Sequence, residues 1–234
     1  MRATVAEKRE VAKGTLLVLF AIDGYPAYRP GAYFWVELPD RGDQDEKGLR
    51  RHISLVTSPT DRGVVGLATR LRDTAFKRTL ASLQVGDEVA VEEPKGSFLL
   101  PEDAGADYVF VAGGIGITVF RSMLRYVAHE QLPYRITLVY SNRDRQSAAF
   151  LDELEELERR IPGLRVVLTM TDEPAWEGET RHLDAEVLRD LVGDLGSKTF
   201  LVAGPPAMAE AVADSLRAAE VPDERVLTDR FSGY

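Results

Sequence analysis

Two short stretches of the chain carry residue types that can bind a phosphorylated ligand, and the first is Arg51-His52-Ile53-Ser54. An arginine at the start of a strand can form charge-assisted hydrogen bonds to a phosphate. Side chains alternate along a strand, so Arg51 and Ser54 face opposite sides, and Ser54 can offer its hydroxyl or its N–H to a heteroatom. Taken alone, a solvated Arg51, an exposed His52 and a passive Ser54 are the simpler interpretation.

The second stretch is the glycine-rich turn Gly113-Gly114-Ile115-Gly116-Ile117-Thr118, which lies between an apolar strand and a helix. Glycines let the backbone come close to a ligand. The helix that follows directs its free N–H groups and the positive end of its dipole at the same point, which favours a pyrophosphate there. The spacing differs from the GxGxxG fingerprint. The alternative is a tight strand-to-helix turn without a ligand.

Two further segments are candidates for the same kind of ligand. Gly204-Pro205-Pro206 follows a strand, at the edge where a parallel sheet binds ligands, and a proline suits the first turn of a helix. A rigid loop explains this segment when it is taken alone, but together with the glycine turn it would border one cleft. The helix start Thr74-Ala75-Phe76-Lys77 is a second possible seat for a phosphate, by the same dipole argument.

The elements that would position these residues change character near residue 100. The first hundred residues contain short strand patterns separated by turn residues, which is typical of an antiparallel barrel or sandwich. One helix is expected over 74–83, where Phe76, Leu80 and Leu83 have helical spacing. The expected strands cover residues 2–11, 15–23, 32–38, 52–57, 64–70 and 87–93.

From residue 108 onward, apolar strands alternate with helices, which indicates a parallel, doubly wound sheet. Asp184 is the expected N-cap of one of these helices. The Gly/Pro/Asp-rich segment 95–107 marks a boundary, so we expect two domains, residues 1–100 and residues 101–234. The strands are expected at 108–112, 135–140, 164–170, 199–204 and 225–229, and the helices at 117–130, 150–161, 183–192 and 206–219.

The composition limits the possible partners. The chain has 234 residues and a formal net charge of −9, which argues against broad nucleic-acid binding and against an anionic membrane surface. It contains no cysteine, which excludes disulfides and cysteine-ligated iron–sulfur clusters, and its three histidines lack metal-ligand spacing. The longest apolar run, Leu16 to Ile22, is too short to span a membrane, so we expect a cytoplasmic protein without membrane insertion.

These motifs, in this order, resemble those of the ferredoxin–NADP reductase superfamily, in which a flavin-binding antiparallel barrel precedes a nicotinamide-binding α/β domain. Arg51-His52-Ile53-Ser54 is similar to the family's Arg-x-Tyr-Ser flavin motif, with isoleucine in place of the aromatic residue. The turn at 113–118 resembles its nicotinamide glycine turn, and Ala203-Gly204-Pro205-Pro206 resembles its Cys-Gly-Pro-Pro motif. The likeness covers essentially the whole chain.

The resemblance implies FAD, or alternatively FMN, in the barrel and NADPH or NADH as co-substrate over the α/β domain. Ser54 would hydrogen-bond flavin N5 and Thr118 would lie near the nicotinamide, so these two are the candidate catalytic residues. Arg51 and the 74–77 helix start would hold the flavin phosphate, and Phe231 or Tyr234 would lie against the flavin ring. The full set of implied cofactor-binding residues is Arg51, His52, Ile53, Ser54, Arg70, Thr74, Ala75, Phe76, Lys77, Gly113, Gly114, Gly116, Ile117, Thr118, Arg143, Gly204, Pro205, Pro206, Phe231 and Tyr234.

The implied function is a flavin-dependent NAD(P)H oxidoreductase that passes hydride from nicotinamide to flavin and then electrons to a separate acceptor, such as a ferredoxin or an oxygenase component. A reductase of free flavin or ferric chelates without a protein partner, and a non-catalytic nucleotide-binding redox sensor, are the alternatives. The coenzyme preference is open. Arg143 or Arg145 could take the 2′-phosphate of NADPH, whereas Asp144 could accept from a ribose hydroxyl of NADH. A solvated charged loop is equally compatible with these residues.

Overall fold

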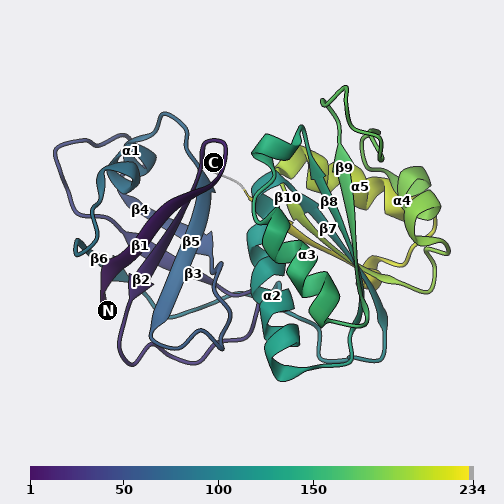
Figure 1. Ribbon diagram of the computed structural model, residues 1–234, viewed down its shortest axis with the longest axis horizontal. Coiled ribbons are helices and arrows are strands. Elements are labelled where there is room, and N and C mark those ends of the chain that lie inside the picture. Colours follow the sequence, from purple (N-terminus) through teal and green to yellow (C-terminus); the bar gives the residue numbers. More distant parts are fainter. Residues whose placement is uncertain (232–234) are drawn as a thin grey trace.

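The computed structural model describes residues 1–231 and folds them into two domains, one built on an antiparallel sheet and one on a parallel sheet (Figure 1). This arrangement confirms the fold class expected from the sequence. The antiparallel strands end at Val91 and the parallel sheet begins at Asp107. The division of the chain after residue 100 stays a prediction.

The first domain holds six strands in the order β4-β3-β6-β1-β2-β5. Every paired neighbour runs antiparallel. The N–H of Val56, which follows β4, donates to the carbonyl of Gly66 in β5 at 2.9 Å, and this bond joins the two edges of the sheet into a barrel. The strands are β1 (Arg2–Ala12), β2 (Thr15–Ala21), β3 (Tyr33–Glu37), β4 (Arg50–Ser54), β5 (Val64–Arg70) and β6 (Glu88–Val91), and the helix α1 (Ala75–Ser82) lies between β5 and β6.

Strand β4 differs from the strand expected at 52–57, because it begins and ends earlier. Its ladder with β3 ends at the pair Ser54 and Tyr33. The N–H of Leu55 still donates to the carbonyl of Ala32, the residue before β3, whereas the N–H of Val56 donates to Gly66 of β5. The apolar run therefore continues beyond the strand, while the chain crosses from one sheet edge to the other.

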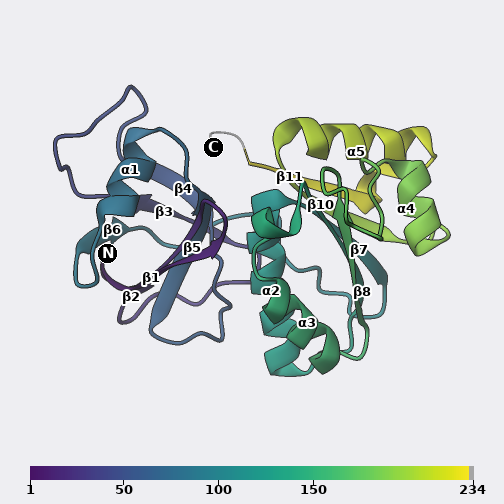
Figure 2. The same cartoon turned by 45° about the horizontal axis from the view of Figure 1, so that its top comes forward.

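The second domain holds a five-stranded sheet in the order β11-β10-β7-β8-β9, and each pair of neighbours is parallel. Helices α2 and α3 cover one face of the sheet, and α4 and α5 cover the other, which makes it doubly wound (Figure 2). The strands are β7 (Asp107–Gly113), β8 (Arg135–Asn142), β9 (Leu164–Met170), β10 (Thr199–Gly204) and β11 (Val226–Arg230). The helices are α2 (Ile117–Glu130), α3 (Leu151–Arg160), α4 (Ala185–Val192) and α5 (Pro206–Ala218), with short 3-10 turns η1 (Gly114–Gly116), η2 (Arg145–Ser147) and η3 (Asp223–Arg225).

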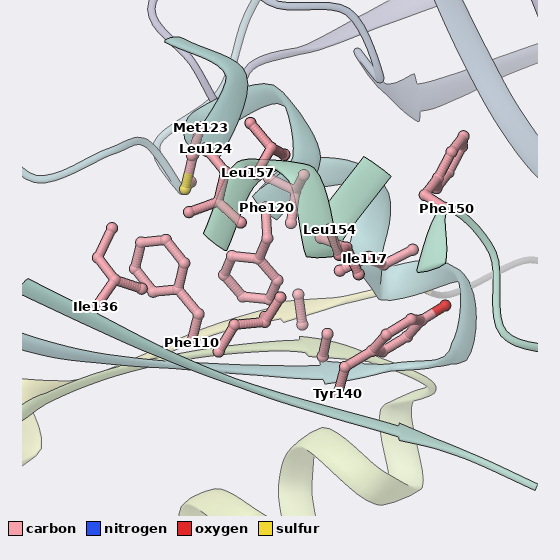
Figure 3. Packing of buried hydrophobic residues seen from close by; sticks show 14 of the residues in the cluster. Phe110, Ile117, Phe120, Met123, Leu124, Ile136, Tyr140, Phe150, Leu154 and Leu157 are labelled. Atoms are coloured by element: carbon pink, nitrogen blue, oxygen red, sulfur yellow. The ribbon is translucent and has the colours of Figure 1, made fainter. Parts of the chain in front are cut away.

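The core of the second domain explains why its strands are continuously apolar. Successive residues of β7 are buried on opposite faces, with Phe110 against α2 and α3 and Val109 against α4 and α5. Phe110 stacks on Phe120 of α2 with 4.8 Å between ring centroids, and Leu154 of α3 packs into the same cluster (Figure 3). A sheet covered on both faces requires apolar residues at both alternating positions, which is the pattern of this half of the sequence.

Local signals in the sequence also set the ends of helices. Asp184 caps α4 as expected, because its carboxylate accepts the N–H of Val187 at 2.9 Å. Helix α5 begins with Pro206, whose missing N–H costs nothing in the first turn. Within residues 1–231, no helix combines the length and the apolar character that a membrane crossing requires.

Candidate functional site

A cavity of about 440 Å³ lies at the carboxyl edge of the parallel sheet, where doubly wound folds bind their ligands. Both domains contribute to its wall, since Arg70 ends β5 and Arg72 lies just before α1, whereas the remaining residues belong to the second half of the chain. It is lined by Arg70, Arg72, Gly113, Gly114, Ile115, Ser141, Asn142, Arg143, Thr171, His182, Pro205, Pro206, Met208 and Phe231. The structure thus brings Gly113 and Gly114 of the glycine turn, Pro205 and Pro206, Arg70, Arg143 and Phe231 together around one cavity. The glycine turn and the Gly-Pro-Pro segment were expected to border one cleft, whereas the expected contacts with flavin and nicotinamide stay predictions.

The glycine turn is shaped by close contacts on both of its sides. A Cβ at Gly116 would lie 2.2 Å from the carbonyl oxygen of Ala203, so any larger residue would push β10 away from the turn. Gly114 has a φ of +52°, and a Cβ there would lie 3.0 Å from a guanidinium nitrogen of Arg70. Glycine is therefore required at 116 for packing within the domain and at 114 because of the positive φ.

Thr118 and Ile117 lie behind the turn rather than in the cavity wall. Both are buried, and the hydroxyl of Thr118 donates to the carbonyl of Ile115 at 3.0 Å. Ile117 points into the cluster between α2, α3 and the sheet (Figure 3). Thr118 thus supports the conformation of the turn, and its expected contact with nicotinamide stays a prediction.

A second cluster of predicted residues lies in the barrel around the start of α1. The guanidinium of Arg51 lies 5.4 Å from the ring centroid of Phe76, and Lys77 is only 4% exposed. Burial lowers the pKa of Lys77 to about 8, helped by the charges of Arg72 and Arg51. Positive groups thus converge on the end of a helix whose dipole is also positive, and such an arrangement favours a phosphate.

The N-terminus of α1 is in contact with a carboxylate from a distant loop. Asp45 accepts the N–H of Ala75 at 2.9 Å, and one of its oxygens lies 3.8 Å from Arg51. The hydrogen bond from Ala75 is the largest cause that lowers the pKa of Asp45, with smaller contributions from Lys47 and Arg51. A negatively charged group thus already lies against the first N–H groups of α1, and the expected binding of a flavin phosphate at this helix start stays a prediction.

The other residues of the Arg51–Ser54 motif do not share one surface. Ile53 belongs to the barrel core at 3% exposure, and Ser54 is buried at the end of β4. His52 lies on the outer face, where its ring centroid is 5.0 Å from that of Trp35. It therefore lies on the opposite side of the strand from Arg51, and its predicted role as a cofactor contact stays a prediction.

The segment directly after β11 returns to the cavity with Phe231. The N–H of Phe231 donates to the carbonyl of Gly204 at 3.1 Å, and its buried side chain lines the cavity. Tyr234, the other aromatic expected against the flavin, lies outside the described residues. Asp229 precedes this segment in β11 as the partner of Ala203, and burial raises the pKa of its carboxyl to about 6.

Several cavity residues were missed by the sequence analysis. Ser141, Asn142 and Thr171 lie at or just after the carboxyl ends of β8 and β9, so the rule that ligands bind at this edge would have found them. Arg72 and His182 belong to loops, and no local pattern marks them. The complete set of missed lining residues is Arg72, Ile115, Ser141, Asn142, Thr171, His182 and Met208.

Comparisons with known proteins agree with this geometry. Residues 110–214 match the family of the oxidoreductase NAD-binding domain. The chain is 28% identical to the reductase component of propane 2-monooxygenase from Rhodococcus jostii, over 88% of this chain and 56% of the relative. It is 30% identical to the ferredoxin reductase component of 3-ketosteroid-9-alpha-monooxygenase from Mycobacterium tuberculosis, over 87% of this chain and 55% of the relative. The chain thus spans about half the length of these curated relatives.

One solved structure extends the likeness to the whole chain. The cytochrome P450 reductase GcoB from Amycolatopsis superposes with a TM-score of 0.83 at 25% identity. The match covers 99% of this chain and 70% of that protein. Both domains, and the arrangement of one against the other, therefore have a counterpart in a reductase of known structure.

Proposed function

The chain belongs to the ferredoxin–NADP reductase superfamily, and from this premise we propose that it is a flavin-dependent NAD(P)H reductase which delivers electrons to a separate acceptor. The observation that carries the proposal is the cavity that both domains share. Arg70 of the barrel lies against Gly114 of the nicotinamide-type turn, so ligands held by the two domains would lie side by side. A bound flavin would supply the chemistry by accepting hydride from the reduced nicotinamide and releasing electrons onward.

The barrel residues would bind and orient the flavin. Arg51, Lys77 and the first N–H groups of α1 would hold its phosphate, since they form the positive cluster in that domain. Ser54 ends β4 directly before the chain crosses to β5, and we assign it the contact with the flavin ring. Phe231 would cover the ring from the side of the second domain, because its side chain lines the shared cavity.

The second domain would bind the nicotinamide nucleotide along the sheet edge. Gly113 and Gly114 would let the pyrophosphate approach the backbone, and Pro205 and Pro206 would form the opposite wall. Of the described residues that line the cavity, none is an aspartate or a glutamate, whereas three are arginines. This charge distribution favours the coenzyme with the extra phosphate, so we propose NADPH as the preferred donor.

The acceptor is proposed to be a separate protein or a diffusible compound. Both curated relatives described above are named as reductase components of monooxygenase systems, one of them as a ferredoxin reductase component. The chain contains no cysteine, so these 234 residues cannot themselves ligate an iron–sulfur cluster through thiolates. We therefore favour a ferredoxin or an oxygenase component as the partner over free flavin or ferric chelates.

An absorbance spectrum tests the central proposal. The purified protein, supplied with FAD or FMN and freed of excess flavin, should show the flavin bands and lose them when NADPH is added without oxygen. NADH should bleach them more slowly. A colourless protein that takes up neither flavin would contradict the proposal, and a yellow protein that neither coenzyme bleaches would indicate a binding module without turnover. Turnover with a ferredoxin against turnover with a ferric chelate then separates the two kinds of acceptor.

A further inference from the structure

We propose that Asp45 is an internal competitor for the flavin phosphate, which holds the N-terminus of α1 with its own carboxylate and has to leave when a phosphorylated flavin binds. The inference rests on the proposed function, because it concerns the site assigned above to the flavin phosphate. It adds a residue that no sequence motif contains and a reason for the flavin to be exchangeable.

The contacts of Asp45 are those that a phosphate would make. One carboxylate oxygen accepts the N–H of Ala75 at 2.9 Å, in the first turn of α1. The other accepts the N–H of Lys47 at 2.9 Å and lies 3.8 Å from a guanidinium nitrogen of Arg51. The first turn of α1 has no acidic residue of its own, so the negative charge comes from a loop thirty residues earlier in the sequence.

The local charges favour a phosphate over one carboxylate. Lys77 is buried beside the charges of Arg51 and Arg72, and these charges help to lower its pKa. The next cation, Arg78, is engaged by Asp43 at 2.7 and 2.8 Å and by Asp73. A carboxylate brings one negative charge to Lys77, Arg51 and Arg72. A phosphate brings up to two negative charges, and it also has more acceptor oxygens. The phosphate therefore displaces Asp45, at the cost of the contacts that Asp45 gives up.

The loop that carries Asp45 is closed at its base, and Asp43 of the same loop pairs with Arg78 of α1. Leu38 and Leu49 close the base of the loop through a backbone hydrogen bond of 3.0 Å. Between them, Gly42 and Gly48 have positive φ values of 84° and 64°, and the segment forms no strand. The Asp45 side chain can therefore turn away from α1 while Asp43 keeps its contact with Arg78 and while β3 and β4 keep their pairing.

The charge of Asp45 can be removed without changing its shape, which gives a direct test. Asp45→Asn should bind FAD and FMN severalfold to about tenfold more tightly than the unmodified protein, because the amide carries no charge to compete for Arg51 and for the positive end of α1, although its oxygen can still accept the N–H of Ala75. Riboflavin has no phosphate, so its affinity should not change. Affinities are measured by the quenching of flavin fluorescence in titrations of the whole chain, and release rates by exchange against excess unlabelled flavin.

Asp43→Asn is the matched control. It removes one negative charge from the same loop, yet Asp43 contacts Arg78 and not the N–H groups of α1. Its effect on FAD affinity should stay below about twofold, as for an exposed ion pair. Unchanged or weaker FAD binding by Asp45→Asn, or an equal gain for riboflavin or in Asp43→Asn, would overturn the competitor role and leave the reductase proposal standing. Failure of both the unmodified and the variant protein to bind any flavin would overturn both.

Discussion

Arg121 of α2 donates a hydrogen bond of 2.6 Å to the main-chain carbonyl of Val56, the second residue after β4. The next residue along the helix does the same, since the hydroxyl of Ser122 donates to the carbonyl of Thr57 at 2.6 Å. All four residues are buried. The helix that follows the glycine turn is thereby tied to the segment that follows Ser54, and these bonds fix the spacing between the two halves of the proposed site.

The first prediction concerns the ion pair that the buried Arg121 forms in addition to this contact. Arg121 also donates to Glu153 of α3 at 2.7 Å. Although burial opposes it, Arg121 and Arg125 lower the pKa of Glu153. Arg121→Met should reduce the free energy of unfolding by about 3 kcal/mol, because it leaves a partly buried carboxylate with one partner fewer and a buried carbonyl without its donor. Urea denaturation at neutral pH measures this loss.

The control for Arg121 is an exposed ion pair of the same residue types. Arg160 lies 3.7 Å from Glu156 on α3, and both side chains are more than half exposed. Arg160→Met should therefore change the free energy of unfolding by less than about 1 kcal/mol. Equal losses in the two variants would mean that the contacts of Arg121 together contribute no more than a surface ion pair.

The second prediction concerns the glycine that packs against β10. Gly116→Ala places a Cβ 2.2 Å from the carbonyl oxygen of Ala203, and the backbone of this residue is otherwise suited to alanine, with a φ of −56°. The clash should lower the free energy of unfolding by roughly 1–3 kcal/mol and weaken nucleotide binding, because the turn must shift. Thermal or urea unfolding and a coenzyme titration measure the two effects.

Gly196→Ala is the matched control for the turn. The nearest atom to a Cβ at Gly196 is 3.7 Å away, in the side chain of Asp194, which is an ordinary contact. This exposed substitution should be tolerated within about 0.5 kcal/mol. If Gly116→Ala were tolerated equally well, the glycine would not be required for packing.

The fold could be predicted because its signals are local and repeated. The apolar runs 108–112 and 199–204 form strands that are buried on both faces. Continuous apolar strands that alternate with helices are the pattern of a parallel sheet with helices on both sides. The end of β8, beyond residue 140, was not predicted, because it lacks this apolar signal. Its last residues, Ser141 and Asn142, extend the strand through backbone pairing with β9, and polar side chains give no apolar signal for it.

The site was only partly predictable, because its missed members depend on tertiary contacts. Arg51 and Lys77 could be proposed from the strand and helix that carry them, and the structure places both near the start of α1. Asp45 could not be proposed, since its contact with Ala75 joins residues thirty positions apart and its loop has no periodic pattern. His182 lines the cavity but could not be proposed either, because its loop contains no motif.

The third prediction is a pH dependence of stability that Asp229 causes. Burial raises the pKa of its carboxyl to about 6 from an ordinary value of 3.8. Between about pH 4 and pH 6 the carboxyl is protonated in the native state and ionised in the unfolded state, so the free energy of unfolding falls as the pH rises. The contribution of Asp229 to stability is therefore complete below about pH 4 and is lost as the pH rises through 6. A shift of two pKa units corresponds to about 3 kcal/mol at most.

Asp229→Asn is neutral at every pH and should remove this loss. The variant should be more stable than the unmodified protein by about 1–3 kcal/mol near pH 7.5, and the difference should shrink toward pH 5. Urea unfolding at the two pH values measures it. Asp214→Asn, at an exposed position of α5, should show no such pH-dependent difference. If the free energy of unfolding of Asp229→Asn and of the unmodified protein changed equally with pH, Asp229 would not be the cause of the pH dependence.

The fourth prediction concerns the preference for NADPH over NADH, which we expect the loop after β8 to determine. Arg143 lines the cavity, whereas the carboxylate of Asp144 accepts the N–H of Ser147 at 2.8 Å and caps η2. Arg145 lies 5.0 Å over the ring of Trp176 and is not part of the cavity wall. The basic residue is therefore available to a 2′-phosphate, while the acidic one is engaged in holding the turn.

Arg143→Gln should consequently lower kcat/KM for NADPH by roughly ten- to a hundredfold, the value of a lost charge-assisted hydrogen bond, and change that for NADH by less than about threefold. Arg145→Gln should leave both values nearly unchanged. Steady-state rates with each coenzyme and one artificial acceptor provide the comparison. An equal loss with NADPH and NADH would place Arg143 at the pyrophosphate, which the two coenzymes share, and would remove the structural reason for preferring NADPH.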